Sequence, residues 1–295
     1  MLSILIPVYN TSVIQLVSQI SNMAKSTGFD YELRIADDAS TDEILKSENQ
    51  KLAQNQNCYY HTIPENHGRT ATRQFLAESA NYNYLLFLDA DVMPLRKNFL
   101  QVILKHIEKA QVIFGGIVYP KTIPEKEYAL HYKYGKNREV KSIAARNKKP
   151  YLALISQHLL IEKSVFLACN PAEENAYGLD PYFSHRLEQQ QVSVLHIDNP
   201  TVHLGLETSE HYLVKTRTGL QTLVTLEKAK KISENYRPLQ RVAYVLKKLR
   251  LQQHVLSLLQ KQELKILKNL YSSQPNLRLF DLYRLLYYLK LKQDA

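Results

Sequence analysis

Apolar and polar residues follow two alternating patterns over the first two thirds of the chain. Segments of strand length and strand-like composition occur at residues 3–9, which is an apolar run, and at 32–38, 58–64 and 84–92. The segments between them carry apolar residues at helical spacing, as in residues 13–24. Strands that alternate with helices predict a mostly parallel sheet flanked by helices. We therefore expect an α/β protein.

The second of these helices has a start signal in the sequence. Ser40 is followed three residues later by Glu43, which is the spacing of a capping box. In that motif the serine and the acidic residue each accept a hydrogen bond from the backbone of the other. We expect the helix to begin at these residues.

A purely helical pattern without strands begins at about residue 210. Residues 211–295 contain 17 Lys and Arg against 5 Asp and Glu, whereas residues 1–210 contain 21 against 23. The net charge of +10 is therefore concentrated in the last part of the chain. We predict one domain at residues 1–210 and a basic, amphipathic helical C-terminal region at residues 211–295.

Polar residues follow three of the predicted strands at their carboxyl ends. Tyr9 and Asn10 follow the first strand, Asp37 and Asp38 end the second, and the motif from Asp89 to Asp91 follows the run "LLFL". Ligands of parallel α/β sheets bind beyond the carboxyl ends of the strands. We expect these three clusters to lie on the same edge of the sheet.

The motif Asp-Ala-Asp at residues 89–91 predicts a divalent cation. Glycine is scarce, at 8 of 295 residues, and the chain has no glycine-rich phosphate loop. A site that holds a diphosphate without such a loop needs a cation, and Mg²⁺ or Mn²⁺ is bound by one or two carboxylates together with substrate phosphates. Pairs of aspartates after strands also cap helices, so the motif alone leaves both interpretations open.

Four motifs in this order resemble the family 2 glycosyltransferases: "ILIPVYN", "IADDASTDE", "NHGRTATRQ" and "LLFLDADVMP". The resemblance continues through "YGLDPYF" and "HIDNPTVHLGLE", and it covers roughly residues 1–210. It implies a GT-A fold and an inverting, metal-dependent transfer of a sugar from a nucleoside diphosphate, with UDP-sugar favoured. It also implies a glycan or lipid-linked acceptor in surface polysaccharide synthesis.

The resemblance assigns the nucleotide site residue by residue. Pro7 and Tyr9 would line the base pocket, with the Tyr9 ring stacked on the base. Asp38 would hydrogen-bond the base, with Asp37 in support.

The resemblance also assigns the diphosphate and metal site. Arg69 and Arg73, four residues apart on one helical face, would approach the base or the diphosphate. Asp89 would contact the ribose or the metal, Asp91 would bind the metal directly, and His203 would be a further metal or diphosphate ligand. A solvated helix face is the alternative for the arginines.

Asp180 is the residue that the resemblance offers as catalytic base, to take the proton of the acceptor hydroxyl. The family has Glu-Asp at this point, whereas this chain has Leu179 before Asp180. Asp180 followed by Pro181 also has the sequence of a helix start, with Asp at the N-cap. If Asp180 is only a cap, the base has to be sought elsewhere, for example at Glu173 or Glu174.

The last features of the sequence bear on the cellular location of the protein and on alternative functions. No apolar run is long enough to span a bilayer, and we expect a cytoplasmic protein whose basic helices either contact the anionic inner face of the membrane or pack on the domain. No nucleic-acid-binding motif accompanies the basic charge. Alternatives are a degenerate family member that acts as a membrane-associated assembly subunit, and a sugar-phosphate nucleotidyltransferase.

Overall fold

The computed structural model describes residues 1–122 and 124–293, and the chain forms two compact units. Unit 1 comprises Met1–Val118, Val140–Asn175 and Arg186–Gly205, and unit 2 comprises Tyr119–Glu139, Ala176–His185 and Leu206–Ala295. Unit 2 thus contains the basic helical region expected after residue 210, together with two earlier segments of the chain.

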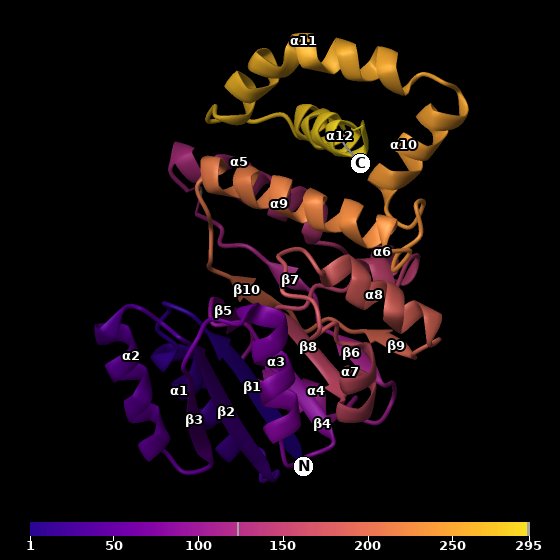
Figure 1. Cartoon of the computed structure of the whole chain (residues 1–295). Helices are drawn as coiled ribbons and strands as arrows, with labels where there is room; N and C mark the ends of the chain where they lie inside the picture. Colours follow the sequence, from indigo (N-terminus) through magenta and orange to yellow (C-terminus); the bar gives the residue numbers. More distant parts are fainter. Residues whose placement is uncertain (123, 294–295) are drawn as a thin grey trace. The chain divides into compact units, whose positions relative to one another are not determined.

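Unit 1 is built on a seven-stranded, mostly parallel sheet (Figure 1). Its strand order is β3-β2-β1-β4-β8-β6-β9, and only β8 is antiparallel to its neighbours. The strands are β1 (Leu2–Val8), β2 (Tyr31–Asp38), β3 (Cys58–Ile63), β4 (Tyr84–Leu88), β6 (Val112–Phe114), β8 (His158–Glu162) and β9 (Val194–His196). The predicted α/β class with a mostly parallel sheet is confirmed.

Helices cover both faces of this sheet because successive strand residues point to opposite sides. Leu2, Ile4, Ile6 and Val8 of β1 point into a core shared with α1 and α4, while α3 packs on the other face of β1 and β2. The helices of this unit are α1 (Ile14–Lys25), α2 (Glu43–Gln50), α3 (Gly68–Ser79), α4 (Phe99–Leu104), α6 (Ile143–Asn147) and α7 (Lys163–Cys169), with the short 3₁₀ helices η1 (Lys51–Gln54) and η4 (Tyr151–Ala153).

The predicted capping box at the start of α2 is wrong. Asp42 is the N-cap, and its Oδ1 accepts hydrogen bonds from the backbone N–H of Ile44 and Leu45, each at 3.1 Å. The Ser40 hydroxyl instead accepts a hydrogen bond from the backbone N–H of Asn10, in the loop after β1. A contact across 30 residues of sequence thus replaces the local one.

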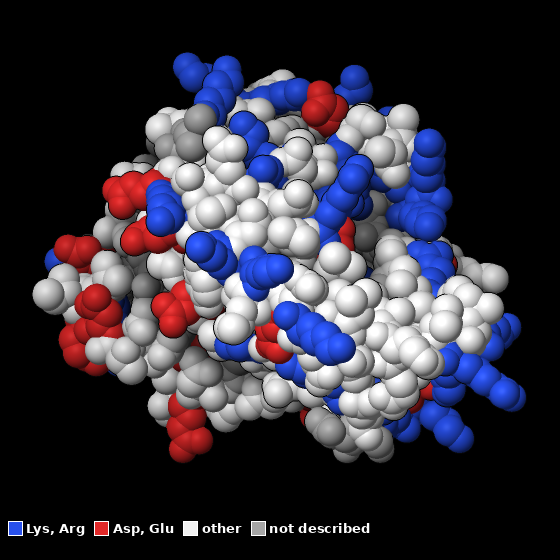
Figure 2. Space-filling view, turned by 90° about the horizontal axis from the view of Figure 1, so that it is seen from above, with Lys and Arg blue, Asp and Glu red and all other residues white. Residues whose placement is uncertain are grey.

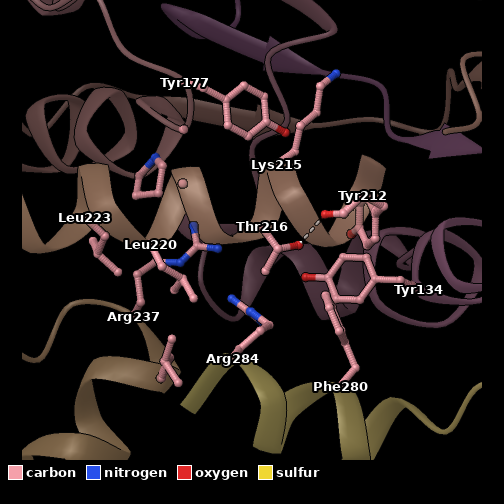
Figure 3. A pocket seen from close by; sticks show the side chains of 14 residues that line it. Tyr134, Tyr177, Tyr212, Lys215, Thr216, Leu220, Leu223, Arg237, Phe280 and Arg284 are labelled. Carbon is pink, nitrogen blue, oxygen red and sulfur yellow. Dashed lines mark hydrogen bonds between the residues drawn. The ribbon is translucent and has the colours of Figure 1, made fainter. Parts of the chain in front are cut away.

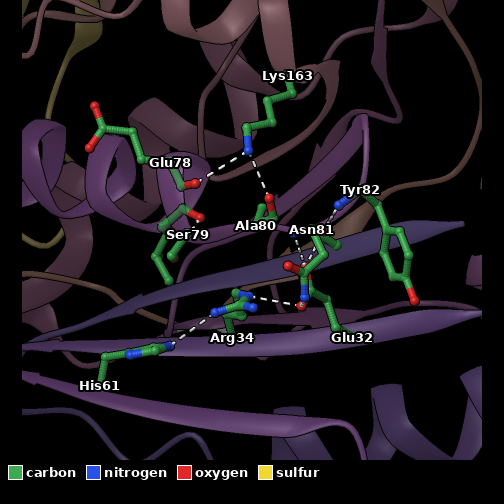
Figure 4. A network of polar contacts seen from close by, with 11 residues as sticks. Glu32, Arg34, His61, Glu78, Ser79, Ala80, Asn81, Tyr82 and Lys163 are labelled. Carbon is green, nitrogen blue, oxygen red and sulfur yellow. Dashed lines mark hydrogen bonds and ion pairs between the residues drawn. The ribbon is translucent and has the colours of Figure 1, made fainter.

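A buried polar network joins the amino ends of β1, β2 and β4 (Figure 4). Glu32 accepts hydrogen bonds from the Ser3 hydroxyl at 2.6 Å, from Arg34 Nε at 2.9 Å and from the backbone N–H of Asn81 at 2.6 Å. Because the Glu32 charge is paired and hydrogen-bonded, its burial is tolerated. The network holds the end of the sheet opposite to the predicted ligand edge.

A second, three-stranded sheet of unit 1 has the order β5-β10-β7, from β5 (Val92–Pro94), β10 (Thr201–His203) and β7 (Ile117–Val118). Gly115 and Gly116 separate β6 from β7. A Cβ at Gly115 would lie 2.1 Å from the backbone oxygen of Asn199, so only glycine permits this approach. The pairing of β10 with β5 is antiparallel and sets His203 opposite Val92.

Unit 2 is helical within the described residues. Its helices are α5 (Ala129–Tyr134), the π-helical turn η3 (Gly135–Glu139), the start of α8 (Asp180–Gln189), α9 (Ser209–Lys228), α10 (Pro238–Lys248), α11 (Gln252–Leu270) and α12 (Leu277–Gln293), with the 3₁₀ helix η2 (Lys126–Tyr128). Glu227 of α9 is buried and accepts hydrogen bonds from the Tyr288 hydroxyl at 2.6 Å and from Gln240 at 2.5 Å. Among the described helices, none has the length and apolarity that a bilayer span requires.

Candidate functional site

The carboxyl ends of β1, β2 and β4 lie on one edge of the sheet of unit 1. Val8 pairs with Asp37 in parallel register, and Leu5 pairs with Phe87. Tyr9, Asp38 and Asp89 therefore follow or end neighbouring parallel strands at the same edge. Pro7 is buried within β1, and its Cα lies opposite Ala36.

Asn10 ties the loop after β1 to the loop after β2. Its side-chain oxygen accepts hydrogen bonds from the backbone N–H of Thr41 at 2.8 Å and of Asp42 at 3.1 Å. The Tyr9 side chain next to it is 48% exposed. The ring of Tyr9 is thus held on a fixed loop with a face available for stacking.

Asp37 and Asp38 both have partners within unit 1. Asp37 accepts hydrogen bonds from the backbone N–H of Ser40 at 2.7 Å and from the Tyr60 hydroxyl at 2.5 Å. Asp38 accepts from the backbone N–H of His67 and of Gly68, each at 2.9 Å, at the start of α3. Asp38 therefore positions the helix that carries Arg69 and Arg73, a role that depends on contacts about 30 residues away in the sequence.

The two arginines of α3 converge on Asp89. Arg73 forms an ion pair with Asp89 Oδ1 and donates to the backbone oxygen of Ser156 at 2.8 Å. Arg69 Nη1 lies 3.7 Å from Asp89 Oδ2. The Arg73 side chain is buried, whereas that of Arg69 is 43% exposed. Arg73 thus orients Asp89, and Arg69 also faces solvent.

Asp91 meets His203, which comes from a strand more than a hundred residues later in the chain. His203 Nε2 lies 3.3 Å from Asp91 Oδ2, and the side chains are 11% and 39% exposed. Burial raises the pKa of the Asp91 carboxyl, but the hydrogen bond and charge of His203, with the charge of Arg69, outweigh it and hold the pKa below its usual value. Asp91 therefore carries a negative charge at neutral pH.

Gly205 completes the surroundings of Asp91. A Cβ at this position would lie 1.9 Å from Asp91 Oδ2, so a larger residue cannot replace glycine without displacing the carboxylate. The backbone N–H of Leu204 donates to the backbone oxygen of Asp91 at 2.8 Å. In the sequence, the only signal for this contact is the glycine that follows "TVHL".

These residues fit a divalent cation that keeps few protein ligands. Asp91 and His203 supply one carboxylate and one imidazole side by side, while Asp89 is held by the arginines. Within residues 1–122 and 124–293, no group of three or more His, Cys, Asp or Glu side chains is arranged to hold a metal. A cation here would take its other ligands from water and phosphate oxygens, as Mg²⁺ and Mn²⁺ commonly do.

Asp180 lies in unit 2, at the start of α8. The prediction that it is the N-cap is wrong by one residue: the backbone N–H of Phe183 donates to the oxygen of Leu179 at 3.0 Å, so Leu179 is the N-cap and Asp180 is the first helical residue. The Leu179 side chain is buried in the hydrophobic core of unit 2, with Tyr182 and Leu220. That packing accounts for leucine where the family has glutamate.

Of the two other acidic residues considered as a base, Glu173 lies in unit 1. Its Oε1 is 3.3 Å from Arg186 Nη1, and the side chain is exposed. Glu174 lies in the same unit, and its backbone N–H donates to the oxygen of Pro171 at 3.0 Å. Both residues precede Ala176–His185, the segment of unit 2 that carries Asp180.

Three solved structures are similar to this chain, and the two with a TM-score above 0.5 share its fold. Mannosyltransferase PcManGT from Pyrobaculum calidifontis has a TM-score of 0.51 at 11% identity, over 77% of this chain and 64% of that one. Glucosyl-3-phosphoglycerate synthase from Mycobacterium tuberculosis has a TM-score of 0.52 at 13% identity, over 76% of this chain and 79% of that one. S. aureus TarS has a TM-score of 0.48 at 17% identity, over 78% of this chain and 41% of that one.

The chain thus spans less than two thirds of the length of TarS and of PcManGT. None of the curated proteins compared matches it in sequence. The family model of Glycosyl transferase family 2 matches residues 3–166, which is more than half of the chain and includes every strand-edge motif described above except His203. Together with the sheet order and the GT-A neighbours, this match shows that the chain belongs to glycosyltransferase family 2.

Proposed function

We propose that this glycosyltransferase is an inverting, metal-dependent enzyme that uses a nucleoside-diphosphate sugar, with UDP-sugar favoured. Its acceptor would be a glycan or a lipid-linked sugar in surface polysaccharide synthesis. The observation that carries the proposal is the pairing of Asp91 with His203 at the edge of the sheet where Tyr9, Asp38 and Asp89 also lie.

The chemistry of the strand edge supports a nucleotide donor. The exposed ring of Tyr9 suits stacking on a base, and the exposed part of Arg69 suits a charge-assisted hydrogen bond to a phosphate. Asp38 keeps lone pairs beyond its two backbone partners, and we assign it and Asp37 to the nucleotide side of the site.

The residues around Asp91 support a metal. A divalent cation bound by Asp91 and His203 would neutralise the charge of the departing nucleoside diphosphate. PcManGT is solved with GDP-Man and Mn²⁺, and the M. tuberculosis synthase with Mn²⁺ and UDP, so this fold accepts both a metal and a nucleotide. We propose Mn²⁺ or Mg²⁺ for this chain.

We assign the catalytic base to Asp180. An inverting transfer needs one carboxylate that accepts the proton of the acceptor hydroxyl as its oxygen attacks the anomeric carbon. Asp180 is the first residue of α8, in the position where the family resemblance places the base.

We also propose that α10 and α11 rest on an anionic membrane surface. Val242 and Val245 of α10 and Leu249, which follows its last residue, are exposed, Leu249 by 60%, and Leu264 on α11 is 82% exposed. Residues 241–265 contain six lysines and arginines, and Figure 2 shows basic side chains around uncharged surface on one face of the molecule. Apolar side chains rimmed by cations match the headgroup region of an anionic bilayer.

Hydrolysis of a panel of nucleotide sugars, measured with and without Mn²⁺, tests the proposal. We expect Mn²⁺-dependent release of the nucleoside diphosphate from one donor class, and its loss in Asp91→Asn. Asp30→Asn is the matched control, because Asp30 is an exposed aspartate before β2, at the opposite end of the strand. Equal turnover by Asp91→Asn and Asp30→Asn would contradict the metal assignment.

A further inference from the structure

Unit 2 contains a pocket that the reaction described above does not use (Figure 3). Its volume is about 190 Å³. Its walls come from five separate parts of the chain: the end of α5, the segment before and at the start of α8, the middle of α9, the start of α10, and α12. All of these belong to unit 2.

The lining of this pocket is cationic. Lys215, Arg237 and Arg284 contribute three positive charges, and none of the described residues that line the pocket is acidic. Lys215 is paired with Glu207, and Arg284 Nη1 lies 3.9 Å from Asp281 Oδ1. Arg237 forms no ion pair within the part of the chain that the structure describes.

The two arginines lie close to each other at the centre of the pocket. Figure 3 shows the guanidinium groups of Arg237 and Arg284 facing the same space, with the Tyr134 hydroxyl and the Thr216 side chain beside them. Burial lowers the pKa of Arg237, and the charge of Arg284 lowers it further, against the opposing effects of Tyr134, Asp180 and Tyr236. Two like charges held together in a partly buried space are stabilised by an anion between them.

The size of the pocket limits the anion. A volume of about 190 Å³ corresponds to about six water molecules at roughly 30 Å³ each, and drug-sized ligands need about 300 Å³ or more. A phosphoryl group with the first carbon atoms of its ester fits this space. Two guanidinium forks approaching from different helices match the several oxygens of a tetrahedral phosphate.

The pocket lies beside the residue assigned as base. Tyr177, Gly178 and Pro181 of the lining flank Asp180 in the sequence, and the charge of Asp180 acts on Arg237. A phosphate held between the arginines would therefore be bound in the same unit as Asp180 and on the segment that positions it.

We propose that the pocket of Arg237 and Arg284 binds a phosphate ester group of the acceptor. This inference rests on the proposed function, because it names the class of the acceptor as a phosphorylated one. The phosphate can belong to a soluble phosphate ester or to a lipid headgroup. The chemistry of recognition is the same, and the experiment separates the two sources.

The test measures phosphate binding to the full chain by calorimetry, with glycerol 3-phosphate and with inorganic phosphate as probes. We expect saturable binding to the unaltered protein and a loss of tenfold or more in affinity in Arg237→Gln and in Arg284→Gln, as for the removal of a charged hydrogen bond. Arg278→Gln is the matched control, because Arg278 is exposed on α12, the helix of Arg284, and lies outside the pocket. It should bind as the unaltered protein does.

A second arm uses phosphatidylglycerol vesicles. If the headgroup is the source, Arg284→Gln reduces vesicle binding more than Arg278→Gln does, and the soluble probes bind weakly. Equal binding by Arg237→Gln, Arg284→Gln and Arg278→Gln in both arms would overturn the inference. Arg237→Lys and Arg284→Lys, which keep the charge but lose the planar fork, should bind with intermediate affinity and guard against a folding defect.

UDP affinity in the presence of Mn²⁺ is measured on the same variants. We expect it to be unchanged in all of them, because the residues assigned to the nucleotide and the metal lie in unit 1. Phosphate binding without any donor turnover would contradict the proposed function alone. If the protein turns over the donor but Arg237→Gln and Arg284→Gln bind phosphate as the unaltered protein does, this inference alone is contradicted.

Discussion

The acidic strand edge of unit 1 and the cationic pocket of unit 2 differ in how fully their charged side chains are paired. At the strand edge of unit 1 the acidic residues have partners: Tyr60 for Asp37, backbone amides for Asp38, Arg73 for Asp89 and His203 for Asp91. In the pocket of unit 2, cations face one another without an acidic residue in the lining. In our proposals, the donor side is preorganised by its own contacts, whereas an anion from outside would complete the pocket.

We expect the largest effect on the catalytic rate from a change at Asp180, the residue of unit 2 that we propose as catalytic base. This change tests whether unit 2 takes part in the reaction as unit 1 does. Asn keeps the size of Asp but cannot accept a proton, so Asp180→Asn should lower kcat by about 10²-fold or more, the usual contribution of a general base. Donor affinity and the free energy of unfolding should change little, because a base acts mainly in the transition state.

The measurement for Asp180 is a steady-state rate with saturating donor. Glu188→Gln, an exposed position on the same helix, is the control. Near-normal transfer by Asp180→Asn would leave Asp180 without a catalytic role, and Glu173 and Glu174 would then be examined.

The second effect concerns Asp38, whose carboxylate serves both the fold and, in our proposal, the nucleotide. Asp38→Ala should weaken the binding of UDP without metal by about 1.5–3 kcal/mol, the cost of losing a charged hydrogen bond. It should also lower the free energy of unfolding by about 1 kcal/mol, because the backbone N–H groups at the start of α3 lose their acceptor. Calorimetry in EDTA and urea unfolding separate the two, and lower stability with unchanged UDP affinity would reduce Asp38 to a structural role.

The strand-edge residues of unit 1 could be predicted from the sequence because their signals are local. Apolar runs that end in Tyr9, Asp38 or Asp89 mark strands and their carboxyl ends within a few residues. The approach of His203 to Asp91 was not predictable from spacing, and only the family resemblance suggested a shared role. It depends on the pairing of β10 with β5 across more than a hundred residues.

The features that sequence analysis missed depend on contacts between distant segments. Asp42 replaces Ser40 as the cap of α2 because the loop after β1 engages Ser40. Leu179 rather than Asp180 is the N-cap of α8, because the backbone oxygen of Leu179 accepts the first hydrogen bond of the helix, and the Leu179 side chain packs in the core of unit 2. The pocket of unit 2 has no motif at all, since five separate parts of the chain contribute to it.

A third effect is a dependence of stability on pH that arises in unit 1. Burial, together with the charge of Arg146, lowers the pKa of His158 and of His196 to about 4, against the opposing effect of a backbone hydrogen bond to each ring. The folded state thus keeps both rings neutral, while the unfolded state takes up protons below a pKa of about 6.5. Their stabilisation is complete above that pH and is lost as the pH falls from about 6.5 towards 4, at up to about 1.4 kcal/mol per pH unit for each histidine.

Urea unfolding at a series of pH values measures this loss. The His196→Gln variant should show a smaller slope between pH 6.5 and 4 than the unaltered protein. An identical slope would mean that His196 does not contribute to it.

The smallest effect concerns the outer face of unit 2. Val245→Gln removes an exposed apolar side chain from the proposed membrane face of α10, and vesicle binding should fall by roughly two- to fivefold. Val214→Gln is the matched control, because Val214 is also an exposed valine, on α9. If both variants sediment with phosphatidylglycerol vesicles as the unaltered protein does, α10 has no apolar contact with the membrane.

The most direct test of the central claim, that Asp91 joins a divalent cation to the nucleotide, is a calorimetric titration of UDP with and without Mn²⁺. In the unaltered protein and in Asp30→Asn, we expect Mn²⁺ to tighten UDP binding by about tenfold or more, as one charge-assisted contact does. In Asp91→Asn, UDP should bind with the metal-free affinity whether or not Mn²⁺ is present. A full Mn²⁺ effect on UDP binding in Asp91→Asn would contradict the account.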